Sequence, residues 1–145
     1  MTTVRDVVDI AGQDQFLAVV STLRADGTIQ SSVVNAGVLA HLVGGADVVG
    51  FATYGRAKLG NLRVRPQLSI TCRAGWKWVT VEGQAELIGP DDPHSAIDAD
   101  GLRLLLSEVF SAAGGTHDDW DVYDRTMAEE RRTAVLVTPL RLYGN

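Results

Sequence analysis

Two positively charged side chains stand where a predicted strand gives way to a predicted helix. The apolar run Asp47–Thr53 predicts a strand buried on both faces, and Gly55 precedes a helical pattern that begins with Arg56 and Lys58. The amide groups and positive dipole end of a helix N-terminus suit a phosphate, and both side chains add charge-assisted hydrogen bonds. The spacing therefore favours a phosphate site. A surface helix start with two solvated cations is the alternative.

The distribution of charge supports a small anionic ligand. The 145-residue chain has a formal net charge of −5. Between Asp47 and Glu82 there is no acidic residue, and the charged side chains are the cations Arg56, Lys58, Arg63, Arg65, Arg73 and Lys77. The acidic total disfavours nucleic acids and membrane surfaces as partners, whereas one cationic stretch suits a small anion. A chance run of cations solvated on separate faces is the alternative.

Other catalytic patterns are absent from the sequence. It has no glycine-rich dinucleotide or Walker loop and no G-x-S-x-G motif. Its three histidines, His41, His94 and His117, lack the spacing of metal ligands, and Cys72 has no histidine near it in the sequence. The sequence therefore identifies no catalytic residue and no metal site.

Length and composition indicate a single domain, residues 1–145. A chain of this size buries a sufficient core without disulfides, and its 46% hydrophobic and 21% charged residues are typical of globular proteins. The lone Cys72 excludes an internal disulfide and favours a reducing compartment. No apolar run is long enough to span a bilayer, and the N-terminus lacks a signal-peptide pattern, so we expect a cytoplasmic protein.

Most of the elements that position these residues are predicted to be strands. β-branched runs separated by glycine turns indicate antiparallel hairpins. The predicted strands are residues 16–23, 29–36, 47–53, 67–73, 76–88 and 133–143, the last interrupted near Pro139. Six or so antiparallel strands with peripheral helices predict a mainly β fold, a closed or split barrel.

Four helices are predicted around these strands. Helical spacing places two of them at residues 4–11 and 56–65. A third is predicted to begin at a cap formed by Asp100 and to end at Gly114-Gly115. The last is capped by Asp118 or Asp119, with Trp120, Tyr123 and Met127 facing inward and Arg131 and Arg132 in its final turn.

Two linked runs of the sequence carry a family resemblance. They are T-Y-G-R-A-K-L-G-N-L-R-V-R-P-Q-L-S from Thr53 and G-W-K-W-V-T-V-E-G-Q-A-E-L from Gly75. Together they resemble the pyridoxamine-phosphate-oxidase-like family of FMN-binding split β-barrels. More narrowly, R-x-K-x-x-N-L followed by a W-V-x-V-E-G-x-A strand is similar to the actinobacterial branch that uses the deazaflavin coenzyme F420. The likeness extends from about Phe16 to Tyr143, nearly the whole chain.

The resemblance implies a homodimer with cofactor sites at the subunit interface. Matched by motif, Arg56 and Lys58 would bind the cofactor phosphate, and Asn61 would contact the phosphate or the ribityl chain. Trp78 would come from the partner subunit, with a core aromatic as the alternative. Many relatives have Ser-Pro in the second strand, which this chain lacks. Ala57 would be a further cofactor contact, and the residues expected to line the ring are Ala52, Thr53, Ser32, Val33, Val34 and Asn35.

The activity that the resemblance implies is hydride transfer between reduced F420 and a conjugated organic acceptor, such as an enone or a biliverdin-like molecule. The protein would hold the ring against this small-molecule substrate and leave the chemistry to the cofactor. The proton would come from solvent or from Lys77, Tyr123 or Arg125. The alternatives are an FMN-dependent oxidoreductase, a non-catalytic protein that binds or stores F420, and a structural β-domain without a ligand.

Overall fold

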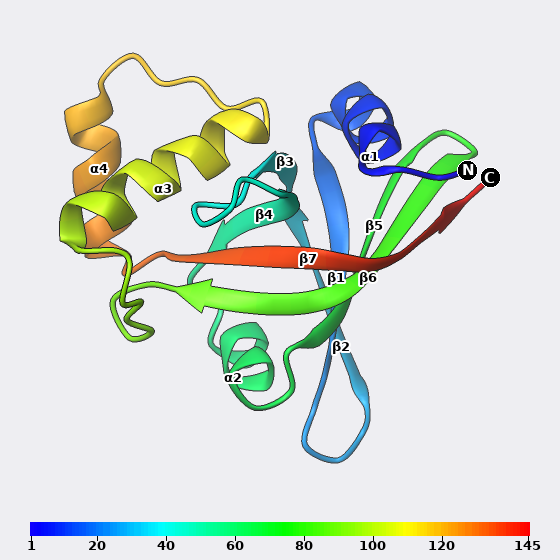
Figure 1. The fold of residues 1–145 in the computed structure, drawn as a ribbon, viewed down its shortest axis with the longest axis horizontal. Coiled ribbons are helices and arrows are strands. Elements are labelled where there is room, and N and C mark those ends of the chain that lie inside the picture. Colours follow the sequence, from blue (N-terminus) through cyan, green and yellow to red (C-terminus); the bar gives the residue numbers. More distant parts are fainter.

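The computed structural model describes residues 1–145 as seven strands, four α-helices and one 3-10 turn (Figure 1). The strands are β1 (Leu17–Leu23), β2 (Ile29–Asn35), β3 (Gly37–Ala40), β4 (Asp47–Thr53), β5 (Gln67–Ala74), β6 (Lys77–Ile88) and β7 (Thr133–Gly144). The helices are α1 (Val4–Ala11), α2 (Arg56–Val64), α3 (Ala99–Ala112) and α4 (Trp120–Glu129), and the 3-10 turn is η1 (Gly12–Asp14). None of the helices combines the length and the apolar character needed to cross a bilayer.

All seven strands form one antiparallel sheet in the order β2-β1-β5-β6-β7-β4-β3. The two edge strands, β2 and β3, are consecutive in the chain and are separated by Ala36 alone. The sheet must therefore curl until its edges meet at that residue, and Ala36 is fully buried there. The edges are not hydrogen-bonded to each other, so the barrel is split, as the sequence predicts.

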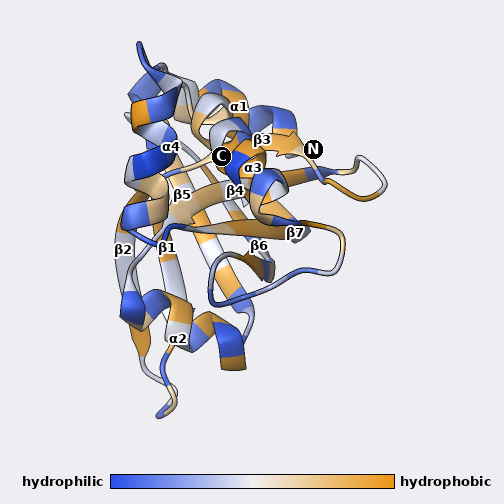
Figure 2. Ribbon diagram, turned by 90° about the vertical axis from the view of Figure 1, so that its left-hand side faces the viewer, coloured by the Kyte–Doolittle hydropathy of each residue, from blue (hydrophilic) through white to orange (hydrophobic).

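The helices cover the barrel from two sides. In both views, α1, α3 and α4 lie on one side of the long β6–β7 pair and α2 lies on the other (Figures 1 and 2). Figure 2 shows β7 largely apolar and α4 largely hydrophilic. The end of α3 lies so close to β3 that a Cβ atom at Gly37 would overlap the Ala112 carbonyl. Glycine is therefore required where the helix meets the edge strand.

The buried core has two parts. The larger fills the barrel and includes Val20, Phe51 and Ile70, all fully buried. The smaller lies between the sheet and α3 and includes Leu106 and Val109. Burying each of these large apolar side chains contributes about 1.5–3 kcal/mol. The smaller cluster holds α3 against β4 and β7.

Several predicted boundaries differ from the observed ones. Strand β3 was not predicted, because four residues are too few for an alternating pattern to stand out. Helix α3 is capped by Asp98, whose side chain accepts from the Gly101 N–H, and not by Asp100. Asp119 caps α4, but the helix ends at Glu129, so Arg131 and Arg132 follow it instead of forming its last turn.

Two predicted details near the C-terminus are wrong. Trp120 is exposed, although its ring meets Phe110 edge-on. Strand β7 runs through Pro139 without a break, because Pro139 lies opposite Gly83 at a register shift between Glu82 and Gly83. A bulge of this kind accommodates a residue that has no N–H to donate.

Candidate functional site

A cavity of about 480 Å³ lies where β2, β4 and the start of α2 approach α3 and α4. Strand ends form one wall and the two C-terminal helices form the other. The residues that line it are Val33, Val34, Asn35, Ala52, Thr53, Tyr54, Gly55, Lys58, Val109, Phe110, Ala113, Tyr123, Met127 and Arg132. Lys58 and Arg132 are the charged members of this set, and no carboxylate lines the cavity.

The corner between β4 and α2 places Lys58 in this cavity. Strand β4 ends at Thr53, and the extended backbone of Gly55 lets helix α2 begin at the next residue. The Thr53 hydroxyl accepts from the Gly55 N–H at 3.1 Å and from Lys58 Nζ at 3.4 Å. Because Leu59 is buried on the barrel side of the same turn, the helix is held with its first turn over the cavity.

Lys58 is a buried cation without a carboxylate partner. Its exposed fraction is 7%, and it takes part in no ion pair. Burial lowers the pKa of Lys58, and the nearby charge of Arg132 lowers it further. A buried charge with so little compensation is costly unless an opposite charge joins it. The electrostatics of this corner therefore favour an anion.

Arg132 is the second cation at the cavity, and no pattern in the sequence marks it as a site residue. The pairing of Thr53 with Thr133 brings it beside the end of β4. Its guanidinium carbon lies 4.1 Å from the centre of the Tyr54 ring, and its Nε donates to Glu130 Oε2 at 2.7 Å. Only this strand register reveals its position, because Arg132 lies far from Lys58 in the sequence.

None of the three predicted proton donors offers a free proton to the cavity. Tyr123 lines it, but its hydroxyl donates to the Leu106 carbonyl at 3.0 Å, and burial raises the pKa of Tyr123 to about 12. Lys77 is exposed and donates to the main-chain oxygen of Asn145. Arg125 is exposed and does not line the cavity.

The structure brings together more than half of the predicted cofactor contacts. Ala52, Thr53, Val33, Val34, Asn35 and Lys58 all line the same cavity. Ser32 lies beside them on β2, and its Oγ is buried without a hydrogen-bond partner. This oxygen has almost no accessible surface and Ser32 is not part of the lining, so the structure does not bring Ser32 into contact with the cavity.

Other predicted contacts lie away from the cavity. Arg56 and Ala57 are exposed and outside its lining. The Asn61 amide donates to Thr22 Oγ1 at 3.0 Å, across the barrel end. Trp78 packs edge-on against Tyr143, with ring centres 6.1 Å apart, and belongs to neither core cluster. It does not line the cavity of its own chain.

The cations of the acid-free stretch do not gather at one place. Arg63 forms a two-point ion pair with Asp92, and Arg65 donates to the Leu23 carbonyl. Arg73 donates to a neighbouring carbonyl within its own hairpin turn. Of the six, Lys58 alone lines the cavity. Most of these cations therefore lie on separate faces, as in the alternative interpretation of the charge pattern. The charged groups of the cavity are Lys58 and Arg132.

These residues fit a flavin-type cofactor. Lys58 and Arg132 offer donors for a phosphate. Ala52, Val109 and Met127 give the cavity an apolar wall, which suits a flat ring system. A volume of about 480 Å³ lies within the usual range for small-molecule sites.

Solved structures with the same fold include flavin-related proteins. The conserved hypothetical protein Rv2991 from Mycobacterium tuberculosis is similar with a TM-score of 0.67 and 18% identity, over 99% of this chain and 84% of that chain. An F420 reductase is similar with a TM-score of 0.59 and 16% identity, over 90% of this chain and 91% of that chain. A pyridoxamine 5'-phosphate oxidase-related, FMN binding protein from Nostoc punctiforme has a TM-score of 0.57 and 14% identity, over 91% of this chain and 78% of that chain.

At the sequence level the evidence comes from a family profile. No curated protein sequence matches this chain. The profile of pyridoxamine 5'-phosphate oxidase matches residues 6–141, which include every strand and helix that forms the cavity. The chain therefore belongs to the pyridoxamine 5'-phosphate oxidase family, whose members are largely oxidoreductases.

Proposed function

We propose that this protein is an F420-dependent oxidoreductase that transfers a hydride between the reduced deazaflavin and a conjugated organic acceptor. The observation that carries the proposal is a cavity with Lys58 and Arg132 in its lining and no carboxylate. F420 carries a phosphate and is anionic, so it would compensate the unpaired charge of Lys58, and Arg132, which is paired with Glu130, would add a second donor. An F420 reductase with the same fold gives this choice of cofactor further support.

In this proposal the chain's own residues bind and orient the cofactor. Lys58 and Arg132 hold its anionic arm, and Arg56, exposed at the same helix start, reaches the phosphate from the solvent side. The apolar wall formed by Val109 and Met127 excludes water from the ring. The bound deazaflavin supplies the hydride chemistry. Because the Tyr123 hydroxyl donates to the Leu106 carbonyl, solvent supplies the substrate's proton in this proposal.

The proposal includes a homodimer that covers the cavity. Val33 and Tyr54 line the cavity yet are 63% and 55% exposed, and Val19, paired with Val33, is exposed beside them. Neighbouring exposed apolar residues mark interaction surfaces. A second copy on this face would bury them and close the site, and its Trp78 would then contribute to the ring pocket.

Two further functions have a specific observation in their favour. FMN also carries a phosphate, and an FMN binding protein has the same fold, which supports an FMN-dependent oxidoreductase. A cofactor carrier without catalysis is supported by the engaged hydroxyl of Tyr123, because none of the three predicted proton donors is free to donate to the cavity. Both functions use the same anion site.

Two measurements on the purified protein separate these functions. Fluorescence titrations with F420 and FMN, run side by side, identify the cofactor, and we expect F420 to bind at micromolar concentration or below. Reduced F420 is then mixed anaerobically with cyclohexenone or biliverdin, and the recovery of F420 absorbance is followed. Faster recovery with protein supports the enzyme. Tight binding without recovery over a broad acceptor panel supports the carrier, and preference for FMN rejects the F420 assignment.

A further inference from the structure

Lys58 has the surroundings of a reactive amine as well as those of an anion-binding group. A lysine reacts as a nucleophile in its neutral form, and proteins promote that form by burying the amine or by placing another cation beside it. Both conditions hold for Lys58, which is 7% exposed. Burial lowers its pKa, and the nearby charge of Arg132 lowers it further. Lys77, the other lysine of the chain, is exposed.

No neighbouring group holds the Lys58 amine in its charged form. Its one hydrogen-bond partner is the Oγ1 of Thr53, at 3.4 Å. A carboxylate beside the amine would stabilise the ammonium form, and none lines the cavity. The cavity volume of about 480 Å³ leaves room for a small carbonyl compound next to the lysine. An electrophilic carbon that enters this cavity therefore meets an available amine.

Arg132 supplies a binding group for the anionic end of such a compound. Its Nε donates to Glu130, and its guanidinium carbon lies 4.1 Å from the centre of the Tyr54 ring. Its two terminal nitrogens donate to no other group of the chain, so a planar pair of donors remains for a carboxylate. Arg132 and Lys58 line the same cavity. A small molecule with a carboxylate and a carbonyl group can therefore bind Arg132 and present its carbonyl carbon to Lys58.

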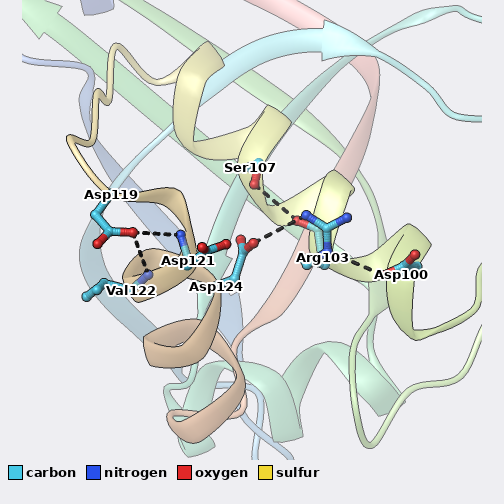
Figure 3. Close-up of polar contacts among 7 residues, drawn as sticks. All are labelled: Asp100, Arg103, Ser107, Asp119, Asp121, Val122 and Asp124. Atoms are coloured by element: carbon cyan, nitrogen blue, oxygen red, sulfur yellow. Dashed lines mark hydrogen bonds and ion pairs between the residues drawn. The ribbon is translucent and has the colours of Figure 1, made fainter.

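The cavity wall formed by α3 and α4 is held in place by polar contacts between the two helices. Figure 3 shows Arg103 of α3 lying between Asp100 and Asp124, so that an ion pair joins α4 to α3. Asp119 caps α4 by accepting from two main-chain N–H groups of its first turn. Met127 of α4 is thereby held in the cavity lining. Apolar side chains at this wall limit the access of water, which would otherwise hydrolyse an imine.

We propose that Lys58 of the cofactor-free protein forms an imine with small aldehydes and ketones that carry a carboxylate, and that Arg132 holds the carboxylate. The lysine nitrogen forms a bond to the carbonyl carbon, the carbon–oxygen double bond breaks, and the oxygen leaves as water with two protons from the amine. The step needs no oxidant or reductant. Such compounds would compete with the cofactor for Lys58. The inference concerns the cavity of the proposed function but does not depend on which cofactor binds there.

Reductive trapping on the full chain tests the proposal. The protein is mixed with 4-oxobutanoate, or with butanal as the uncharged aldehyde of equal carbon number, and cyanoborohydride reduces any imine to a stable secondary amine. Peptide mass spectrometry measures modification of Lys58 relative to Lys77 in the same chain, which cancels the intrinsic reactivity of each aldehyde. We expect this ratio to be about tenfold or more higher with 4-oxobutanoate, because Arg132 binds its carboxylate. Equal ratios, or no modification of Lys58 by 4-oxobutanoate, would overturn the proposal.

A variant of Arg132 tests how the carboxylate is held. Arg132→Met should bring the Lys58-to-Lys77 ratio with 4-oxobutanoate close to the ratio with butanal. The butanal reaction measures the separate effect of the lost charge on the pKa of Lys58. Arg125→Met is the matched control, because Arg125 is exposed and lies outside the cavity, and it should keep the preference of the parent. Circular dichroism checks folding. An unchanged preference in folded Arg132→Met contradicts the assignment.

Competition with the cofactor separates this inference from the proposed function. Excess F420 should protect Lys58 from 4-oxobutanoate and leave the modification of Lys77 unchanged, because both ligands use Lys58. If Lys58 prefers 4-oxobutanoate but F420 gives no protection, the covalent site is supported and the F420 assignment is contradicted. If F420 binds in a fluorescence titration but Lys58 of the cofactor-free protein does not react with 4-oxobutanoate, the cofactor site stands and the covalent site is refuted.

Discussion

The Nζ of Lys58 lies 3.4 Å from the Oγ1 of Thr53, and this hydroxyl is the one hydrogen-bond partner of the lysine. The pair joins the last residue of β4 to the first turn of α2. It leaves most of the hydrogen-bonding capacity of the ammonium group unused inside a cavity without carboxylates. The corner is therefore less stable without an anion than with one, and this difference leads to the first prediction.

Replacing Lys58 by Met should stabilise the cofactor-free protein. Removal of the buried charge is expected to raise the free energy of unfolding at neutral pH by about 1–3 kcal/mol. The folded-state pKa of Lys58 lies below the ordinary value of 10.5, so the charge penalty is complete below that folded-state pKa. It fades as pH rises towards 10.5, and the advantage of the variant should fade with it.

Urea denaturation of both proteins at a series of pH values measures this effect. Lys77→Met is the matched control, because Lys77 is exposed and lies outside the cavity. A Lys58→Met variant that is less stable than the parent at neutral pH, or whose advantage does not change with pH, contradicts an uncompensated buried charge.

Asn61 is predicted to stabilise the fold without binding the cofactor directly. Its amide donates to Thr22 Oγ1, which in turn donates to Gln30 Oε1 at 3.0 Å. Asn61→Ala should lower the free energy of unfolding by about 1–2 kcal/mol, because a buried acceptor loses its donor. Cofactor affinity, measured by fluorescence titration, should stay within a factor of about two. A loss of affinity with unchanged stability would instead support the motif-based contact to the phosphate.

Val33 tests the proposed interface between subunits. Val33→Glu places a charge in the exposed apolar patch and should convert a dimer into a monomer in analytical ultracentrifugation. Val64→Glu is the control, because Val64 is 71% exposed at the end of α2 and lies outside the cavity. A monomeric parent protein, or a dimer that persists in the Val33 variant, would argue against this face as the interface.

The contact between His41 and Glu86 predicts a pH-dependent contribution to stability. The Glu86 hydrogen bond, at 2.8 Å, raises the pKa of His41 above 6.5. The contribution is complete below pH 6.5 and is lost as pH rises through the raised folded-state value. Glu86→Gln should lower the pKa of His41 in NMR titration, and its stability should approach that of the parent at higher pH.

Two other histidines complete the experiment on Glu86. His94 also lies 3.5 Å from a Glu86 carboxylate oxygen, so its resonances should be followed too. His117 forms no ion pair and serves as the internal reference, with no expected change. An unaltered pKa of His41 in the variant would contradict the assignment of the shift to Glu86.

The sequence predicted the barrel well because its strands have strong local patterns. Asp47–Thr53 is an apolar run of strand length that ends at a glycine turn, and the observed β4 has the same bounds. Strand β3 was missed because it is only four residues long and is fixed by its pairing with β4 and by its contact with α3. Tertiary packing, which has no short-range signal, determines such an element.

The cavity was only partly predictable. Lys58 and Thr53 are neighbours in a recognisable motif, so the sequence identified them together. Arg132 lies at the cavity because β4 pairs with β7, a contact between segments far apart in the sequence. The hydrogen-bond partners of Asn61 and Arg63 also come from distant segments. Charge patterning along the chain therefore overstated how many cations meet at the site.

Removal of both cavity cations tests the central claim most directly. F420 is titrated against the parent protein, Lys58→Met/Arg132→Met and the control Arg125→Met, whose exposed arginine lies outside the cavity. The parent and the control should bind at micromolar concentration or below. The double variant should bind about a hundredfold or more weakly, because each charge-assisted bond contributes about 1.5–3 kcal/mol. Equal affinity in all three proteins would contradict the assignment of this cavity to an anionic redox cofactor.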